Sequence, residues 1–161
     1  MLRARDLPDS VLPSLLTRLG LRLVPVGDGE PIPGSYWGPP EAGLLGTSVH
    51  VRADTPVHSV LHEAAHVACM DPDRRGRLHT DARGDDLEES AVCYLQLALA
   101  REVPALAGHD LARDMDDWGY SFRLGSTRAW LEQDAEDARA WLLAHGLLEC
   151  GGRPTFRLRG A

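Results

Sequence analysis

Two histidines four residues apart, with a glutamate directly after the first, are the residues of this chain best suited to chemistry. They form the pentapeptide His62-Glu63-Ala64-Ala65-His66. On an α-helix, residues four apart lie on one face, so both imidazoles can reach a single metal ion. Glu63 can then accept a proton from water at that ion. The pattern predicts a catalytic metal centre, and the plainer interpretation is a pair of hydrogen-bonded core histidines.

The flanking residues predict the helix that this spacing requires. Thr55 is a favourable N-cap residue, and Pro56 suits the first helical turn. The pair Asp71-Pro72 predicts the end of the helix, because the residue before a proline is biased away from helical backbone angles. The pentapeptide therefore lies inside a predicted helix.

A second predicted helix, residues 85–100, carries carboxylates a short way downstream. Its first turn holds Glu88 and Glu89, and either one completes a two-histidine, one-carboxylate site with an open position for water. Glu88 shares the apolar face of this helix, where a buried metal ion is expected, so Glu88 is the favoured third ligand and Glu89 the second choice. The alternative is a structural role: Asp85 with Glu88, or Asp86 with Glu89, could form a capping box that only starts the helix.

The two predicted helices resemble the gluzincin clan of zinc metallopeptidases over about residues 44–100. In several families of this clan the second helix carries E-x-x-A, which Glu88-Glu-Ser-Ala91 matches. The resemblance implies a small bacterial metallopeptidase with a zincin-like fold and Glu63 as general base. It also implies that zinc is held by His62, His66 and Glu88.

Two further features bear on the activity. Those families often place Asp or Asn after the alanine, whereas this chain has Val92, so no partner that orients a ligand histidine is identified. A looser resemblance, to the elongation-factor-P hydroxylase family, is the motif helix followed by Arg74-Arg75. It implies the alternative function of a non-haem iron hydroxylase or oxygenase, which uses the same triad. A metal-stabilised binding module is disfavoured, because a structural site needs no base such as Glu63.

Composition sets the wider limits. A chain of 161 residues with 43% hydrophobic residues predicts one domain, residues 1–161. No apolar run reaches a membrane span, and no secretory signal begins the chain. Three cysteines without C-x-x-C spacing favour free thiols in a reducing cytoplasm. A net charge of −7 without a basic run argues against nucleic-acid binding. We therefore predict a cytoplasmic zinc hydrolase that acts on a peptide or protein substrate.

Hydrophobic patterns predict an α+β domain, mainly helical, with a small sheet beside the motif helix. Strand 21–26 is expected at a sheet edge, because Pro25 cannot donate a ladder hydrogen bond. Strand 44–52 comes just before the motif helix, and we expect it to be an edge that pairs with an extended peptide substrate. Further helices are predicted over 11–18, 104–117 and 127–145, the last of them capped by Ser126.

Other polar and aromatic residues have weaker functional interpretations. Tyr120 could donate a hydrogen bond to an oxyanion, although packing is favoured, and His79 is expected to be a solvated loop residue. Tyr36 and Trp37, in a Gly- and Pro-rich loop, are expected to cover the core rather than line a cleft. A solvated acidic face is expected at Asp110, Asp114, Asp116 and Asp117.

Overall fold

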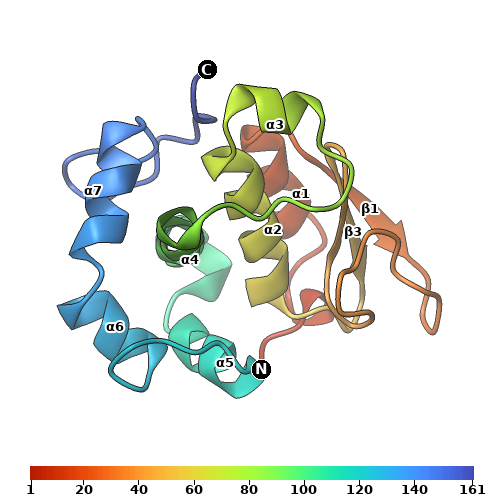
Figure 1. Cartoon of the computed structure of the whole chain (residues 1–161). Coiled ribbons are helices and arrows are strands. Elements are labelled where there is room, and N and C mark those ends of the chain that lie inside the picture. The colour runs from red at the N-terminus through yellow and green to blue at the C-terminus, as the bar shows by residue number, and fades with distance from the viewer.

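Two helices side by side at the centre of the molecule carry the motif residues and the two first-turn glutamates (Figure 1). In this computed structural model, which describes residues 1–161, α2 spans Val57–Cys69 and α4 spans Asp86–Arg101. Eleven of the 13 residues of α2 are buried, so the motif belongs to the core. The α+β prediction is confirmed.

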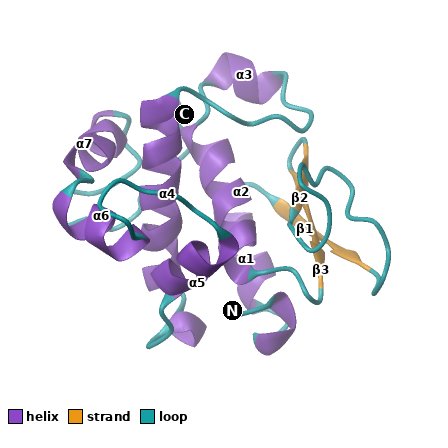
Figure 2. Ribbon diagram, turned by 60° about the horizontal axis from the view of Figure 1, so that its bottom comes forward, coloured by secondary structure: helices purple, strands orange, loops and turns teal.

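The remaining elements form layers on either side of this pair. The sheet lies beyond α2, and the C-terminal helices lie beyond α4 (Figures 1 and 2). Helix α1 packs against the sheet, whereas α7 packs against α4. No helix combines the length and the hydrophobicity that crossing a membrane requires. These outer helices are α1 (Val11–Arg18), α3 (Pro72–Gly76), α5 (Leu111–Trp118), α6 (Thr127–Gln133) and α7 (Glu136–Ala144), with short 3₁₀ turns η1 (Ala4–Asp6) and η2 (Pro104–Leu106).

The sheet has three strands in the order β1-β3-β2, with β1 (Arg22–Val26) parallel and β2 (Gly43–Leu45) antiparallel to β3 (Ser48–Arg52). The expected edge position of β1 is confirmed. The prediction of one edge strand over 44–52 is wrong, because a turn at residues 46–47 folds this segment into a hairpin. The longer arm of that hairpin, β3, has a neighbour on both sides. A substrate peptide therefore cannot extend the sheet along β3.

The outer side of β2 is also covered, by the loop that precedes it. The amide of Leu44 donates to the Gly34 carbonyl at 3.4 Å. A Cβ at Gly34 would lie 2.5 Å from the Leu44 carbonyl oxygen, so only glycine permits this close approach. The amide of Gly46 donates to the His79 carbonyl at 2.9 Å. Loops, rather than a free strand, therefore surround the motif helix on this side.

Several helix boundaries differ from their predictions. The expected helix 127–145 is two helices, interrupted at residues 134–135, although Ser126 caps the first as expected by accepting from the Ala129 amide at 3.1 Å. The expected helix 104–117 is η2 followed by α5. Thr55 does not cap α2: its Oγ1 accepts from the Arg52 amide, and Pro56 occupies the N-cap position.

The aspartates of residues 110–117 are not a solvated face. Asp114 is buried and accepts from the Leu2 amide at 2.9 Å and from His109 Nε2 at 2.6 Å. Burial opposes its ionisation, but these hydrogen bonds and the nearby cations outweigh burial and lower the pKa of Asp114. Asp116 accepts from the Thr127 amide and hydroxyl, and Asp110 caps α5. Asp110 and Asp117 are exposed, but three of the four aspartates, all except Asp117, have partners within the fold and so have structural roles.

Candidate metal centre

Two histidines from α2 and one glutamate from α4 form the candidate metal centre. Ligand atoms of His62, His66 and Glu89 all lie within 4.8 Å of one another. The imidazole centroids are 4.5 Å apart with perpendicular planes, and His66 Nε2 lies 3.6 Å from Glu89 Oε2. Two imidazole nitrogens and a carboxylate oxygen are the donor set of catalytic zinc sites and of non-haem iron sites.

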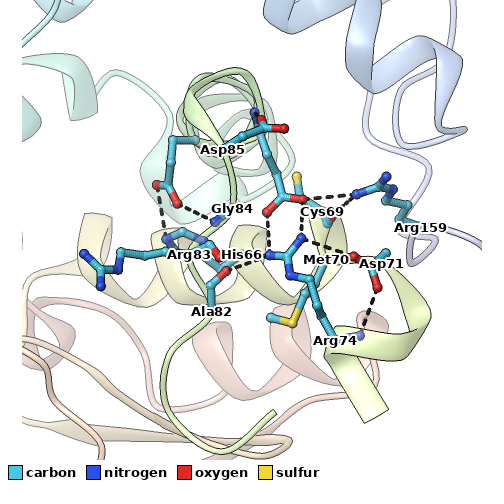
Figure 3. A network of polar contacts seen from close by, with 12 residues as sticks. His66, Cys69, Met70, Asp71, Arg74, Ala82, Arg83, Gly84, Asp85 and Arg159 are labelled. Atoms are coloured by element: carbon cyan, nitrogen blue, oxygen red, sulfur yellow. Dashed lines mark hydrogen bonds and ion pairs between the residues drawn. The ribbon is translucent and has the colours of Figure 1, made fainter. Parts of the chain in front are cut away.

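Glu88, the favoured third ligand of the sequence prediction, faces away from the histidines. Its carboxylate is 3% exposed and accepts from both Nη atoms of Arg74, each at 2.8 Å, and from Arg159 Nη1 at 3.1 Å. Arg74 comes from α3 and Arg159 from the C-terminal segment (Figure 3). The choice of Glu88 is therefore corrected to Glu89. Adjacent residues on a helix point about 100° apart, and this rotation sends the two side chains to different neighbours.

The turn before α4 is shaped by both glutamates. Asp85 caps the helix by accepting from the Glu88 amide at 2.8 Å. Glu89 Oε1 accepts from the Gly84 amide at 3.1 Å, which leaves Oε2 toward His66. A Cβ at Gly84 would clash with the Glu88 carboxylate. Figure 3 shows the segment from Ala82 to Gly84 passing beside His66. Glycine at this position thus lets the loop close over the start of α4.

Gln96, which the sequence analysis did not identify, orients His62. Its amide nitrogen donates to the His58 carbonyl at 2.7 Å, and this fixes the amide oxygen toward His62 Nδ1 at 3.0 Å. His62 Nδ1 must therefore carry the proton, which leaves Nε2 with a free lone pair for a metal ion. Gln96 lies two turns after Glu89 on the same helix face, so a polar residue on that mixed face was the available signal.

Both motif histidines are held in the neutral form that binds metals. Burial lowers the pKa of His66 to about 3, and the nearby His62 and Arg74 act in the same direction. Burial also lowers the pKa of His62, partly opposed by the hydrogen bond with Gln96. Neither imidazole needs to lose a proton before it binds a cation at neutral pH.

Glu63 lines the same cavity as the candidate ligands. Its carboxylate forms no hydrogen bond or ion pair with another side chain. Burial is the main cause that raises the pKa of Glu63 to about 8, and the negative charges of Glu41 and Glu89 add to it. A metal ion bound by the candidate ligands would lower the pKa of Glu63 again, because its positive charge favours the ionised carboxylate. Glu63 is thus an unengaged carboxylate, close to the ligand atoms, with a pKa suited to proton exchange near neutral pH.

Two adjoining hollows form a cleft above the candidate ligands. A separate hollow of about 350 Å³, lined by residues of α4 and α5 among others, contains none of these ligands. The hollow over the ligands has a volume of about 220 Å³, and its neighbour, of about 450 Å³, extends toward α5. Both are lined by Trp37, Glu41 and His62. The lining of the ligand hollow is completed by Tyr36, Glu63, His66, Thr80, Asp81, Ala82, Arg83 and Glu89.

Tyr36 and Trp37 do not cover the core, contrary to the sequence prediction. They are 61% and 79% exposed, and both line the ligand hollow. Their rings meet edge to face, with centroids 4.9 Å apart. Two large aromatic side chains at the entrance of a cleft provide apolar surface for a bound molecule.

The remaining sequence candidates contribute no ligand atom to the site. Tyr120 lines the neighbouring hollow, and its hydroxyl lies 3.3 Å from both His58 Nδ1 and Gln96 Nε2, so it packs against the residues behind His62 as well as lining the cleft. His79 is exposed and does not line the cleft. Arg75 Nη1 donates to the Met70 carbonyl at 2.7 Å, at the end of α2. With Arg74 bound to Glu88, both arginines of the Arg-Arg pair have internal partners.

Comparisons with known proteins identify no relative. No family model, no curated protein and no solved structure matches this chain. The chemistry of the cleft therefore carries the functional argument.

Proposed function

We propose that this protein is a zinc-dependent hydrolase that cleaves peptide bonds. The observation that carries the proposal is the position of Glu63, whose unengaged carboxylate shares one cleft with the His62, His66 and Glu89 donors. Structural zinc sites are normally closed by four protein ligands, whereas catalytic sites have three and an open position. Three donors beneath an open cleft fit the second arrangement.

Each residue of the site has a role in this proposal. Zinc held by the three donors would supply Lewis-acid activation of water and of the substrate carbonyl. Glu63 accepts the proton of the attacking water and delivers it to the departing amide nitrogen. Gln96 keeps the His62 Nε2 lone pair directed at the ion. The peptide lies in the cleft formed by loops, since β3 has no free edge.

The iron hydroxylase alternative uses the same three donors. It leaves Glu63 without a function, because an oxygenase needs open positions for O₂ and substrate rather than a base. Its other support, the Arg-Arg pair, is weakened because Arg74 and Arg75 are engaged by Glu88 and Met70. Hydrolysis is therefore the function we propose.

The test is the substitution Glu63→Gln, which keeps the shape of the side chain and removes the base. We expect zinc content equal to that of the wild type, and peptide cleavage reduced by about two to four orders of magnitude. The matched control is Glu132→Gln on α6, where the glutamate is 59% exposed and lies outside the cleft. A wild-type protein that binds iron and consumes O₂ without cleaving any peptide would refute the proposal, as would full cleavage by Glu63→Gln.

A further inference from the structure

The two hollows of the cleft share three lining residues. Trp37, Glu41 and His62 line the hollow over the candidate ligands and also its neighbour, which continues to Trp118, Gly119 and Tyr120. A peptide that passes over His62 from one hollow to the other therefore passes Trp37 and Glu41. These two residues are the first candidates for selecting a side chain of that peptide.

Trp37 is presented at the cleft by a tightly bonded loop. Glu41 Oε2 accepts from the Trp37 amide at 2.8 Å and from the Ser35 hydroxyl at 3.2 Å. The Gly38 amide donates to the same hydroxyl at 3.1 Å. The indole ring is nevertheless 79% exposed. Together with the neighbouring Tyr36 ring it forms a contiguous exposed apolar surface, which is typical of binding sites, and the bonded loop holds the indole in place for a contact.

Glu41 has an oxygen available for a ligand. Both hydrogen bonds to its carboxylate use Oε2, and no donor reaches Oε1. The cation lining the ligand hollow, Arg83, is engaged elsewhere: it pairs with Asp81 at 3.3 Å and lies over the Tyr36 ring at 5.2 Å. The carboxylate of Glu41 thus lines the cleft beside an exposed indole without a cation of its own.

We propose that Trp37 and Glu41 form a specificity subsite for a cationic side chain, arginine or lysine, of the substrate peptide. The stem of such a side chain packs on the indole face, and its charged end donates to Glu41 Oε1. This inference rests on the proposed peptide hydrolysis and adds the substrate class: peptides with a basic residue next to the bond that is cleaved.

The experiment compares two blocked peptides that differ only in charge. Acetyl-Ala-Ala-Arg-Ala-Ala-amide is compared with the same peptide containing citrulline, the neutral analogue of arginine. The preference in cleavage is measured as the ratio of the two kcat/KM values. The preference in binding is measured by calorimetry with a chelator present, so that cleavage does not interfere. We expect a preference for arginine of about tenfold in both measurements, the size expected for one cation–π contact with one charged hydrogen bond.

Three variants assign this preference to the subsite. In Glu41→Gln the amide oxygen can still accept from Trp37 and Ser35, but the charge is lost, so the ratio should fall several-fold, to the smaller preference that the Trp37 indole alone provides. Trp37→Leu should reduce the ratio several-fold, and Glu132→Gln should leave it as in the wild type. A third peptide, with a free amino terminus and no arginine, tests whether the cation recognised is instead a terminal amine.

The outcomes separate this inference from the proposed function. Cleavage of both peptides at equal rates by the wild type, or a preference of undiminished size in Glu41→Gln, overturns the subsite and leaves the hydrolase in place. A preference only for the free amino terminus also overturns it, because the cation is then not a side chain. Failure to cleave any peptide, with the charge preference still present in binding, overturns the hydrolase and supports the subsite.

Discussion

Glu88 and Glu89 are neighbours in the first turn of α4, yet they belong to two different regions of the molecule. Glu88 enters a buried ion network, where Arg74 and Arg159 neutralise it and its side chain is 3% exposed. Glu89 enters the cleft, where its side chain is 34% exposed and its nearest ionisable partner is His66. Burial raises the pKa of Glu89. The hydrogen bond from the Gly84 amide lowers it, but by less, so the pKa stays above its usual value.

The difference shows that the partners of a carboxylate, rather than its residue type, decide its role. Two arginines occupy the oxygens of Glu88 and leave none for a metal ion. Glu89 has one oxygen held by the Gly84 amide and the other 3.6 Å from His66 Nε2, within the group that also includes His62. The Glu88 region should therefore matter for folding, and the Glu89 region for metal binding. Three predictions test this separation.

The largest expected effect is on folding. Glu88→Ala leaves two arginines without their shared partner, and we expect the free energy of unfolding to fall by about 3–5 kcal/mol. Urea denaturation with a chelator present measures this without any contribution from metal binding. The control Glu132→Ala removes an exposed i,i+4 pair with Arg128 and should cost about 0.5 kcal/mol or less. If Glu88→Ala fails to fold, Glu88→Gln provides the measurement. A loss of unfolding free energy below about 1 kcal/mol in the variant that is measured would contradict the separation.

The second effect concerns the metal. Glu89→Ala removes one of three donors, and we expect zinc affinity to fall by more than about 100-fold, beyond the usual effect of losing an orienting partner. In chelator the unfolding free energy should change by about 1 kcal/mol or less, because this side chain is partly exposed. Competition with a zinc-sensitive dye measures the affinity. Unchanged zinc binding in this variant would exclude Glu89 as a ligand.

The smallest effect concerns the residue that orients His62. Gln96→Leu removes the acceptor for His62 Nδ1, and zinc affinity should fall by about 10–100-fold. Tyr120→Phe is the control, since it removes a hydroxyl contact of Gln96 but keeps the contact between Gln96 and His62. We expect its zinc affinity to stay close to that of the wild type. Equal losses in the two variants would mean that general packing, rather than histidine orientation, sets the affinity.

Features decided by local signals could be predicted from the sequence. Helix α1 has its predicted bounds, the motif helix ends before Asp71-Pro72, and Asp85 and Ser126 cap their helices. The spacing of the two histidines also predicted correctly that they share a helix face. Each of these depends on residues within a few positions of one another, where capping and periodicity act.

Features decided by distant partners could not be predicted in this way. The apolar face of α4 correctly indicated that Glu88 is buried, but periodicity cannot show that Arg74 and Arg159, 14 and 71 residues away, already bind it. The place of β3 in the sheet depends on its parallel pairing with β1. Trp37 lines a cleft because Glu41 bonds to its amide, a loop contact with no periodic signature.

The contacts of Arg159 also bear on the order in which the chain acquires its structure. Its amide donates to the Ala68 carbonyl and its guanidinium to the Cys69 carbonyl, so Arg159 supplies donors to carbonyl groups at the end of the motif helix. Arg75, 84 residues earlier, donates to the Arg159 carbonyl. During synthesis every candidate ligand leaves the ribosome well before Arg159 does. Helices α2 and α4 can pair at that stage with Arg74 alone opposite Glu88, and we expect Arg159 to join the ion network later, because 71 residues separate it from Glu88.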